Sequence, residues 1–266
     1  MRRRWCIPVA ALALVSGSML AATSAASAST AVHSSGHVIV QPGAPARHLI
    51  APFSAHGRTP SSVTSTNWSG YAATGGTGAF TSVSASWVEP TAKCTSGDQY
   101  AAFWVGLDGY TSSSVEQTGS ESDCDGNTPS YYAWWEMYPG GSHTFSNTVK
   151  PGDNFSASVT SDGGGKFTLV ITDSTQGWSK TENKTLSSAK RSSAEVIIEA
   201  PCCTGSGGIL PLADFGTVNF TNSEVNGSPL GDSNPTEIIM QSGSTQKDSI
   251  SALSGGTNFS GTWLHS

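Results

Sequence analysis

The spacing of strand-like segments after residue 60 constrains the fold more than any other feature of the chain. Short runs rich in Val, Ile, Thr and aromatic residues recur there, and most end at Gly, Asn, Asp, Ser or Pro. No segment has a sustained helical period. The runs cover residues 67–73, 82–90, 100–110, 130–139, 155–162, 166–173, 194–201, 216–222, 237–241 and 259–264. This pattern predicts one all-β domain over 61–266, either a sandwich or a barrel.

One of these runs, SSAEVIIEAP (192–201), has carboxylates on one face only. Because side chains alternate along a strand, Val196 and Ile198 point one way, and Glu195 and Glu199 point the other. Two carboxylates on one strand face are unusual in a chain of which only 12% is charged. They are either solvated surface charges or part of a site.

A second run, WWEMY (134–138), places Glu136 between two aromatic side chains, Trp134 and Tyr138, on one face. A buried core face would not accept an unpaired carboxylate. We therefore expect this face to line a concave groove, in which aromatic residues hold a ligand and the carboxylate acts on it.

The first 60 residues differ in composition from the rest. Residues 1–28 have a basic start, an apolar stretch and an A-x-A-like site at 26–28, which predicts a secretory signal. Residues 29–60 contain four of the six histidines and no Asp or Glu. This segment is either a disordered linker or a removable pro-segment.

The part after residue 60 is acidic, with 8 basic and 19 acidic residues and a formal charge of −11. Such a surface would repel the phosphates of nucleic acid, so we expect no nucleic-acid partner. No other segment is long and apolar enough to predict a membrane span. We expect a secreted, extracellular monomer.

Four cysteines follow the predicted signal: Cys94, Cys124, Cys202 and Cys203. An even number in a secreted chain indicates disulfides, and four cysteines allow three connectivities. We favour Cys94–Cys124, which leaves the adjacent Cys202 and Cys203 either to pair with each other under strain or to stay reduced.

The remaining motifs limit the chemistry by elimination. Only His143 and His265 follow residue 60, and the chain contains no H-E-x-x-H, zinc-site C-x-x-C pair, G-x-S-x-G or phosphate-binding glycine loop. We therefore expect no metal and no cofactor, and an enzyme here would use carboxylates. Glu195 and Glu199 lie about 13 Å apart along a strand, so each needs a partner from another strand.

Four motifs together carry a family resemblance. They are NWSGY (67–71), FWVGLDG (103–109) followed by VEQTG (115–119), YYAWWEMYP (131–139) and AEVIIEAP (194–201). In this order and spacing the chain resembles the glutamic peptidase (eqolisin) family of secreted acid endopeptidases. The resemblance implies an antiparallel β-sandwich of the jelly-roll or concanavalin type, with a concave substrate groove on one sheet.

The resemblance also implies a catalytic pair, Gln117 and Glu199. In this assignment Glu199 is the general base and acid that activates water, and Gln117 stabilises the oxyanion. Tyr132 stands where fungal members have an Asp. The residues expected to bind the substrate are Trp68, Trp104, Asp108, Trp134, Glu136 and Glu195.

The sequence thus predicts an endopeptidase that acts on polypeptides. Two alternatives stay open from the residues alone. Sandwiches with tryptophan-rich grooves also bind oligosaccharides, so the domain could bind carbohydrate or cleave glycosides with Glu136 and Glu199. It could also be a catalytically inactive relative.

Overall fold

The computed structural model describes residues 62–202 and 208–266. The predicted signal (1–28) and the predicted pro-segment or linker (29–60) therefore lie outside the described residues. So does Cys203, whereas its neighbour Cys202 is described and buried.

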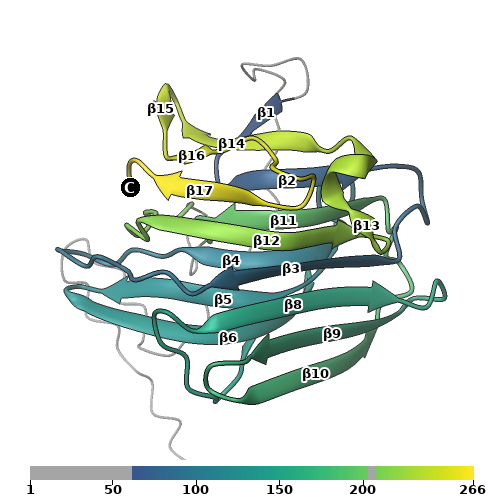
Figure 1. Ribbon diagram of the computed structural model, residues 1–266, viewed down its shortest axis with the longest axis horizontal. Helices are drawn as coiled ribbons and strands as arrows, with labels where there is room; N and C mark the ends of the chain where they lie inside the picture. The colour runs from purple at the N-terminus through teal and green to yellow at the C-terminus, as the bar shows by residue number, and fades with distance from the viewer. Residues whose placement is uncertain (1–61, 203–207) are drawn as a thin grey trace, which may run out of the picture. The chain divides into compact units, whose positions relative to one another are not determined.

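Nearly all regular structure in the described residues is β-strand, arranged in two sheets (Figure 1). The first sheet has nine strands and contains every motif of the predicted site. In spatial order its strands are β1 (Ser62–Ser65), β14 (Thr236–Ser242), β2 (Trp68–Thr74), β11 (Ser193–Glu199), β4 (Ala102–Leu107), β5 (Val115–Asp125), β6 (Thr128–Tyr138) and β7 (His143–Thr144), with β15 (Thr245–Gln246) paired to β14.

The second sheet has eight strands and packs against one face of the first. Its spatial order is β10 (Trp178–Thr185), β9 (Lys166–Asp173), β8 (Asn154–Ser161), β3 (Ser82–Val88), β12 (Thr217–Val225), β17 (Phe259–Trp263) and β16 (Asp248–Ile250), with β13 (Ser228–Pro229) paired to β12. One 3-10 helix, η1 (Leu230–Ser233), follows β13. Every strand pair is antiparallel except β1 with β14, which is parallel. The predicted all-β antiparallel sandwich is confirmed.

The main hydrophobic core lies between the two sheets and follows the alternation of the strands. In β9, for example, Phe167, Leu169 and Ile171 are buried. Trp87 of β3 lies 5.8 Å from Phe155 of β8, ring centre to ring centre. Burying a large apolar side chain stabilises the fold by roughly 1.5–3 kcal/mol, so this layer is the main source of stability.

Strands β4 and β11 are buried on both faces because they lie in the middle of the nine-stranded sheet. Val196 and Ile198 of β11 belong to the core between the sheets, whereas Ile197 belongs to a second apolar cluster with Trp104. The predicted alternation over 194–199 is confirmed. We call the face of the nine-stranded sheet that carries this second cluster the outer face.

Strands β5 and β10 were not among the strand-like runs of the sequence. Both are polar: β5 reads VEQTGSESDCD, and β10 reads WSKTENKT. Ten of the eleven residues of β5 are nevertheless buried. Some polar groups of β5 bind partners on other strands, such as Trp87 for Ser120 and Glu136 for Gln117, which a pattern of apolar residues cannot reveal.

Buried carboxyl groups connect the two sheets. Glu89, just after β3, accepts hydrogen bonds from the hydroxyls of Ser120 and Ser122 of β5. Burial is the main cause that raises the pKa of Glu89 to about 7. Asp248 of β16 accepts a hydrogen bond from Ser69 of β2, and burial raises its pKa to about 7 as well.

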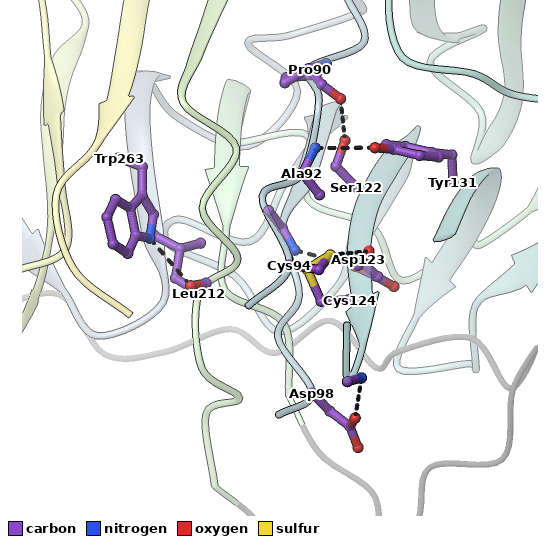
Figure 2. Close-up of a disulfide and its surroundings, with 12 residues drawn as sticks. Pro90, Ala92, Cys94, Asp98, Ser122, Asp123, Cys124, Tyr131, Leu212 and Trp263 are labelled. Carbon is purple, nitrogen blue, oxygen red and sulfur yellow. Dashed lines mark hydrogen bonds between the residues drawn. A yellow bond between two sulfur atoms is a disulfide. The ribbon is translucent and has the colours of Figure 1, made fainter. Parts of the chain in front are cut away.

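The predicted disulfide Cys94–Cys124 is present, with the two Cα atoms 5.4 Å apart (Figure 2). Close to it, the Ala92 N–H donates to the Tyr131 hydroxyl at 3.1 Å, and the Ser122 hydroxyl oxygen lies 3.0 Å from the Pro90 carbonyl oxygen (Figure 2). The disulfide closes a loop that contains β4 and most of β5.

Replacing Cys94 and Cys124 together by Ser should lower the free energy of unfolding by about 3–4 kcal/mol. The disulfide joins residues 30 positions apart. A cross-link of that span lowers the conformational entropy of the unfolded chain, which stabilises the folded state by about this amount. Urea unfolding of both proteins at one pH measures the difference. An unchanged midpoint would show that the cross-link adds no stability.

The free energy of unfolding should fall as the pH rises from about 4.5 to 8. The unfolded chain ionises Glu89 near its ordinary pKa of 4.5, whereas the folded chain ionises it near 7. Between these values the folded state holds the extra proton, so raising the pH favours unfolding, and the full loss is reached above about 7. For Glu89 the loss is about 3 kcal/mol, at 1.36 kcal/mol for each pKa unit.

Urea midpoints measured from pH 4 to pH 8 check this. Glu89→Gln should make the fall of the unfolding free energy with pH less steep but not abolish it. Two other buried acids still titrate: burial raises the pKa of Asp248 to about 7 and that of Glu116 to about 8. The exposed Glu224 gives the matched control, since Glu224→Gln should leave the slope unchanged. A midpoint that rises with pH would contradict this account.

Candidate active site

Polar side chains form two rows across the outer face of the nine-stranded sheet, each row running through β11, β4, β5 and β6. The first row contains Glu195, Gly106, Gln117 and Glu136. The second row contains Glu199, Ala102, Glu121 and Tyr132. A row of Ile197, Trp104, Gly119 and Trp134 separates them.

In the first row, Gln117 is held by Glu136 on the neighbouring strand. The Gln117 Nε2 donates a hydrogen bond to the Glu136 Oε2 at 2.7 Å. A side-chain amide nitrogen carries two hydrogens, so the second N–H remains available for another acceptor. The Gln117 Oε1 has no hydrogen-bond partner among the described residues.

Glu195 lies on the other side of Gln117, with Gly106 between them. Adjacent strands are about 4.8 Å apart, so the Cα atoms of Glu195 and Gln117 are separated by roughly 10 Å. Glycine puts no side chain into that interval. The side chains of Trp104 and Val115 pack there instead, with atoms 2.9 and 3.1 Å from where a Gly106 Cβ would lie.

Glu195 is completely buried, and neither of its carboxylate oxygens has a hydrogen-bond partner of normal geometry among the described residues. Burial raises the pKa of Glu195 well above its usual range. The nearby Ser193 hydroxyl partly offsets this rise, whereas the charges of Asp108 and Glu116 add to it. A buried carboxyl without a partner is costly, and such groups are found at functional sites more often than elsewhere.

In the second row, Glu199 is bound by neighbouring side chains. Its Oε2 accepts a hydrogen bond from the Trp104 Nε1 at 2.9 Å, and its Oε1 accepts one from the Asn67 Nδ2 at 3.3 Å. Glu199 is level with Glu121, which lies four residues beyond Gln117 on β5. That offset is about 13 Å along the strand.

The structure therefore does not bring Gln117 and Glu199 together, because they lie in different rows, four residues apart along the strands. The sequence places Glu195 and Glu199 correctly on one face. Which of the two is level with Gln117 depends on the register of three strands, and the sequence alone does not give that register.

The second row also contains a cluster of acids that the sequence analysis did not identify. The Tyr132 hydroxyl lies 2.9 Å from the Glu121 Oε2 and 2.9 Å from the Asp123 Oδ2. One hydroxyl proton serves only one of these contacts, so the other requires a protonated carboxyl. Burial and the neighbouring Asp123 raise the pKa of Glu121 well above its usual range. Alternation from Gln117 along β5 could have indicated Glu121.

The three predicted tryptophans Trp68, Trp104 and Trp134 all lie on the outer face and are fully buried. Trp68 and Trp104 meet edge to face, with ring centres 4.9 Å apart. Trp104 lies between the two polar rows and is hydrogen-bonded to the second. These three rings belong to the apolar cluster of the outer face.

The carboxylate of Asp108, a residue expected to bind substrate, is bound by backbone N–H groups of this chain. Its carboxylate accepts hydrogen bonds from the N–H groups of Lys190, Arg191 and Ser192 at 2.8, 2.6 and 2.9 Å. Asp108 itself has a positive φ of 71°. These bonds fix the segment that enters β11, so Asp108 is placed to position Glu195.

Within residues 62–202 and 208–266, no group of three or more His, Cys, Asp and Glu side chains is arranged to hold a metal ion. No helix in this part of the chain has the length and apolar character needed to cross a membrane.

Comparisons with known proteins agree with the fold and the motifs. The model of the peptidase A4 family matches residues 66–261. Scytalidopepsin B from Scytalidium lignicola is 35% identical over 201 residues, covering 70% of this chain and 74% of that protein. Aspergillopepsin-2 from Aspergillus niger is 31% identical over 160 residues, covering 54% of this chain and 53% of that protein. The match thus spans about half the length of aspergillopepsin-2.

Solved structures extend the likeness. Scytalido-glutamic peptidase with a transition-state analogue inhibitor superimposes with a TM-score of 0.66 at 28% identity, covering 75% of this chain and 98% of that one. Aspergilloglutamic peptidase from Aspergillus niger superimposes with a TM-score of 0.55 at 26% identity, covering 62% and 99%. The chain therefore belongs to the peptidase A4 family, and its predicted membership of the glutamic peptidases, or eqolisins, is confirmed.

Proposed function

We propose that this protein is an acid endopeptidase that hydrolyses peptide bonds in polypeptides, with Gln117 and Glu195 as its catalytic pair. The observation that carries the proposal is the first row, in which Glu195 and Gln117 flank Gly106 on one face of the sheet. Glu195 takes the role that the sequence analysis gave to Glu199. Family relatives solved with a peptide-based transition-state analogue and with the tripeptide Ala-Ile-His support a polypeptide substrate.

In the proposed reaction, a water molecule between the two side chains attacks the carbonyl carbon of the scissile bond. Glu195 takes a proton from that water, and the free N–H of Gln117 donates a hydrogen bond to the oxyanion that forms. When the C–N bond breaks, Glu195 gives its proton to the leaving nitrogen and returns to its starting state. Glu136 keeps Gln117 in position throughout.

The raised pKa of Glu195 bears on the working pH. A general base works best when its pKa lies close to the pH of the reaction. Burial of Glu195 therefore favours mildly acid over strongly acid conditions. The oxyanion donor is a neutral amide, which needs no change of protonation over this range.

Glycoside cleavage by Glu136 and Glu199 is disfavoured by the register. The two residues lie in different rows, and β4 and β5 separate their strands. Their Cα atoms are about 14 Å apart across the strands and about 13 Å apart along them. Glycosidases hold their two carboxyl groups roughly 5–9.5 Å apart.

Glu195→Gln should reduce casein hydrolysis at acid pH to background, because it removes the proton acceptor while preserving volume. Gln117→Ala should lower kcat by about 10²–10³-fold, the usual cost of losing one oxyanion donor. Glu199→Gln should cost less, because Glu199 binds Trp104 and Asn67. The exposed Glu224→Gln is the matched control and should keep parental activity.

The comparison of Glu195→Gln with Glu199→Gln decides the assignment. Activity retained by the first and lost by the second would restore Glu199 as the base. A parental protein that cleaves no polypeptide between pH 3 and 6 would leave the inactive-relative alternative standing.

We also propose that residues 1–28 direct secretion and that residues 29–60 are a removable inhibitory segment. The segment has Arg47, Arg58 and four histidines but no acid, and the part after it has a formal charge of −11. Opposite charges attract at moderate ionic strength and less so at high salt. The acidic side chains of the part after residue 60 are the expected target of the segment.

A synthetic 29–60 peptide added to the processed enzyme should inhibit hydrolysis at pH 5–6, and the inhibition should weaken toward pH 3. Histidines gain charge below about 6.5, which strengthens attraction, and carboxylates lose charge at lower pH, which weakens it. High salt and the substitutions Arg47→Gln with Arg58→Gln in the peptide should both weaken inhibition. A peptide without effect at every pH would leave the linker interpretation.

A further inference from the structure

We propose that Glu116 is a positioning residue of this peptidase: its buried side chain keeps Gln117 on the outer face only while it carries a proton. This inference rests on the proposed function, in which Gln117 supplies the hydrogen-bond donor for the oxyanion. It gives a role to a buried acid that the proposed reaction does not use.

Glu116 precedes Gln117 on β5 and points to the opposite face of the sheet, toward the core between the two sheets. Its partners on the neighbouring strands are Leu107 of β4 and Met137 of β6. Leu107 belongs to that core, and Met137 packs against it. Glu116 itself is completely buried. Its carboxyl group therefore lies in apolar surroundings.

The carboxyl group of Glu116 has no hydrogen-bond partner of normal geometry among the described residues, at either oxygen. Glu89, another buried acid, instead accepts hydrogen bonds from Ser120 and Ser122. Burying an ionised carboxylate without partners costs far more than burying a protonated one. The position of Glu116 thus favours its protonated form.

The charged groups around Glu116 also oppose its ionisation. Asp108, which follows β4, and Glu195 of β11 interact with Glu116 by charge, and both are acids. Within residues 62–202 and 208–266, Glu116 forms no ion pair with a Lys, Arg or His. Burial, and then the charge of Asp108, raises the pKa of Glu116 to about 8, although the Ser114 hydroxyl partly offsets the rise.

The second sheet brings no compensating charge to this part of the core. Strands β8 and β9 pack against β5. Their buried side chains are apolar except Asp173 at the end of β9. Asp173 is also an acid, and it interacts by charge with Asp153, just before β8. An ionised Glu116 therefore gains favourable partners only by reaching water.

The geometry of β5 connects such a movement to Gln117. Because β5 is bonded to β4 on one side and to β6 on the other, Glu116 reaches water only if β5 turns or shifts in the sheet. Successive side chains alternate between the two faces, so that change also moves Gln117 away from the outer face. The hydrogen bond from Gln117 to Glu136 is then lost, and the oxyanion donor is misplaced.

The displacement of β5 becomes more favourable as the pH rises. A water-exposed Glu116 ionises near its ordinary pKa of 4.5, whereas the buried group ionises near 8. Between these values the buried arrangement holds the extra proton, so each rise of one pH unit favours the displaced arrangement about tenfold. The proposed reaction alone predicts no such loss, because ionised Glu195 is its active form and the Gln117 amide does not titrate. Glu116 therefore sets an upper pH limit for activity.

The test compares the processed enzyme with its variants Glu116→Gln and Glu116→Leu, using an internally quenched peptide substrate from pH 4 to pH 8.5. The ratio of kcat/KM at pH 8.5 to kcat/KM at pH 5.5 should be at least about tenfold larger in both variants than in the parent. The two new side chains differ in polarity and share only the inability to ionise. A change of packing alone would alter the rate but not its dependence on pH. If Glu116→Gln does not fold, Glu116→Leu carries the comparison.

Asp248→Asn is the matched control. Asp248 is also buried, and its pKa is raised to about 7, but it lies on β16 of the second sheet. This variant should keep the parental ratio. An equal gain in Asp248→Asn and in the Glu116 variants would show that general loss of stability sets the upper limit, and would overturn this inference.

Hydrogen exchange of the β5 backbone amides gives a readout that does not depend on catalysis. After correction for the intrinsic effect of pH, these amides should exchange at least about tenfold faster at pH 8.5 than at pH 5.5 in the parent, but not in Glu116→Gln. Exchange of β5 that does not change with pH in the parent would overturn this inference, whether or not the protein is active.

The two proposals fail in different ways. Identical pH profiles of the parent and both Glu116 variants, beside an inactive Glu195→Gln, would overturn this inference and leave the proposed function intact. A parent that cleaves no polypeptide at any pH would overturn the proposed function, and the exchange of β5 would then decide whether Glu116 controls the position of this strand.

Discussion

The register among β11, β4 and β5 is the constraint on which the chemistry of this fold depends. Alternation allows either Glu195 or Glu199 to share a face with Gln117, and a shift of four residues would exchange them. The observed pairing makes Glu195 level with Gln117. Two kinds of contact hold that pairing in place. Apolar side chains of these strands pack toward the second sheet. The Asp108 carboxylate accepts hydrogen bonds from the backbone N–H groups of Lys190 and Ser192, just before β11.

The sequence alone predicted those features that depend on the residue pattern of a single strand. The run 166–173 was predicted and forms β9 over Lys166–Asp173, and the two-faced pattern of residues 134–138 places Trp134 on the outer face. It did not predict features that depend on contacts between strands. The polar strand β5 has no apolar pattern, and two of its side chains, Ser120 and Gln117, are bound by partners on β3 and β6. The roles of Asp108, Glu199 and Glu121 also depend on neighbours that are distant in the sequence.

Buried acids connect the stability of the sandwich to the conditions of its proposed chemistry. Glu89 and Asp248 link the two sheets through serine hydroxyls, and burial raises the pKa of each to about 7. Such groups are neutral in acid, where burying them costs little, and charged near neutrality, where burying them costs much. On the outer face, burial likewise raises the pKa of Glu195 and of Glu121. The fold is thus suited to acid, whereas the role proposed for Glu195 as a base requires that it first lose its proton.

Small residues on β4 complete the division between the two polar rows. Glycine within a strand costs roughly 0.5–1 kcal/mol relative to alanine, so a glycine on β4 needs a compensating benefit. At position 102 alanine lies beside Glu199, which is held by Trp104 and Asn67. At position 106 the side chains of Trp104 and Val115 pack where a Cβ would lie, and Glu195 has no hydrogen-bond partner of normal geometry among the described residues. The same strand therefore lies beside two buried acids of which one, Glu199, is held as a hydrogen-bond acceptor and the other, Glu195, is not.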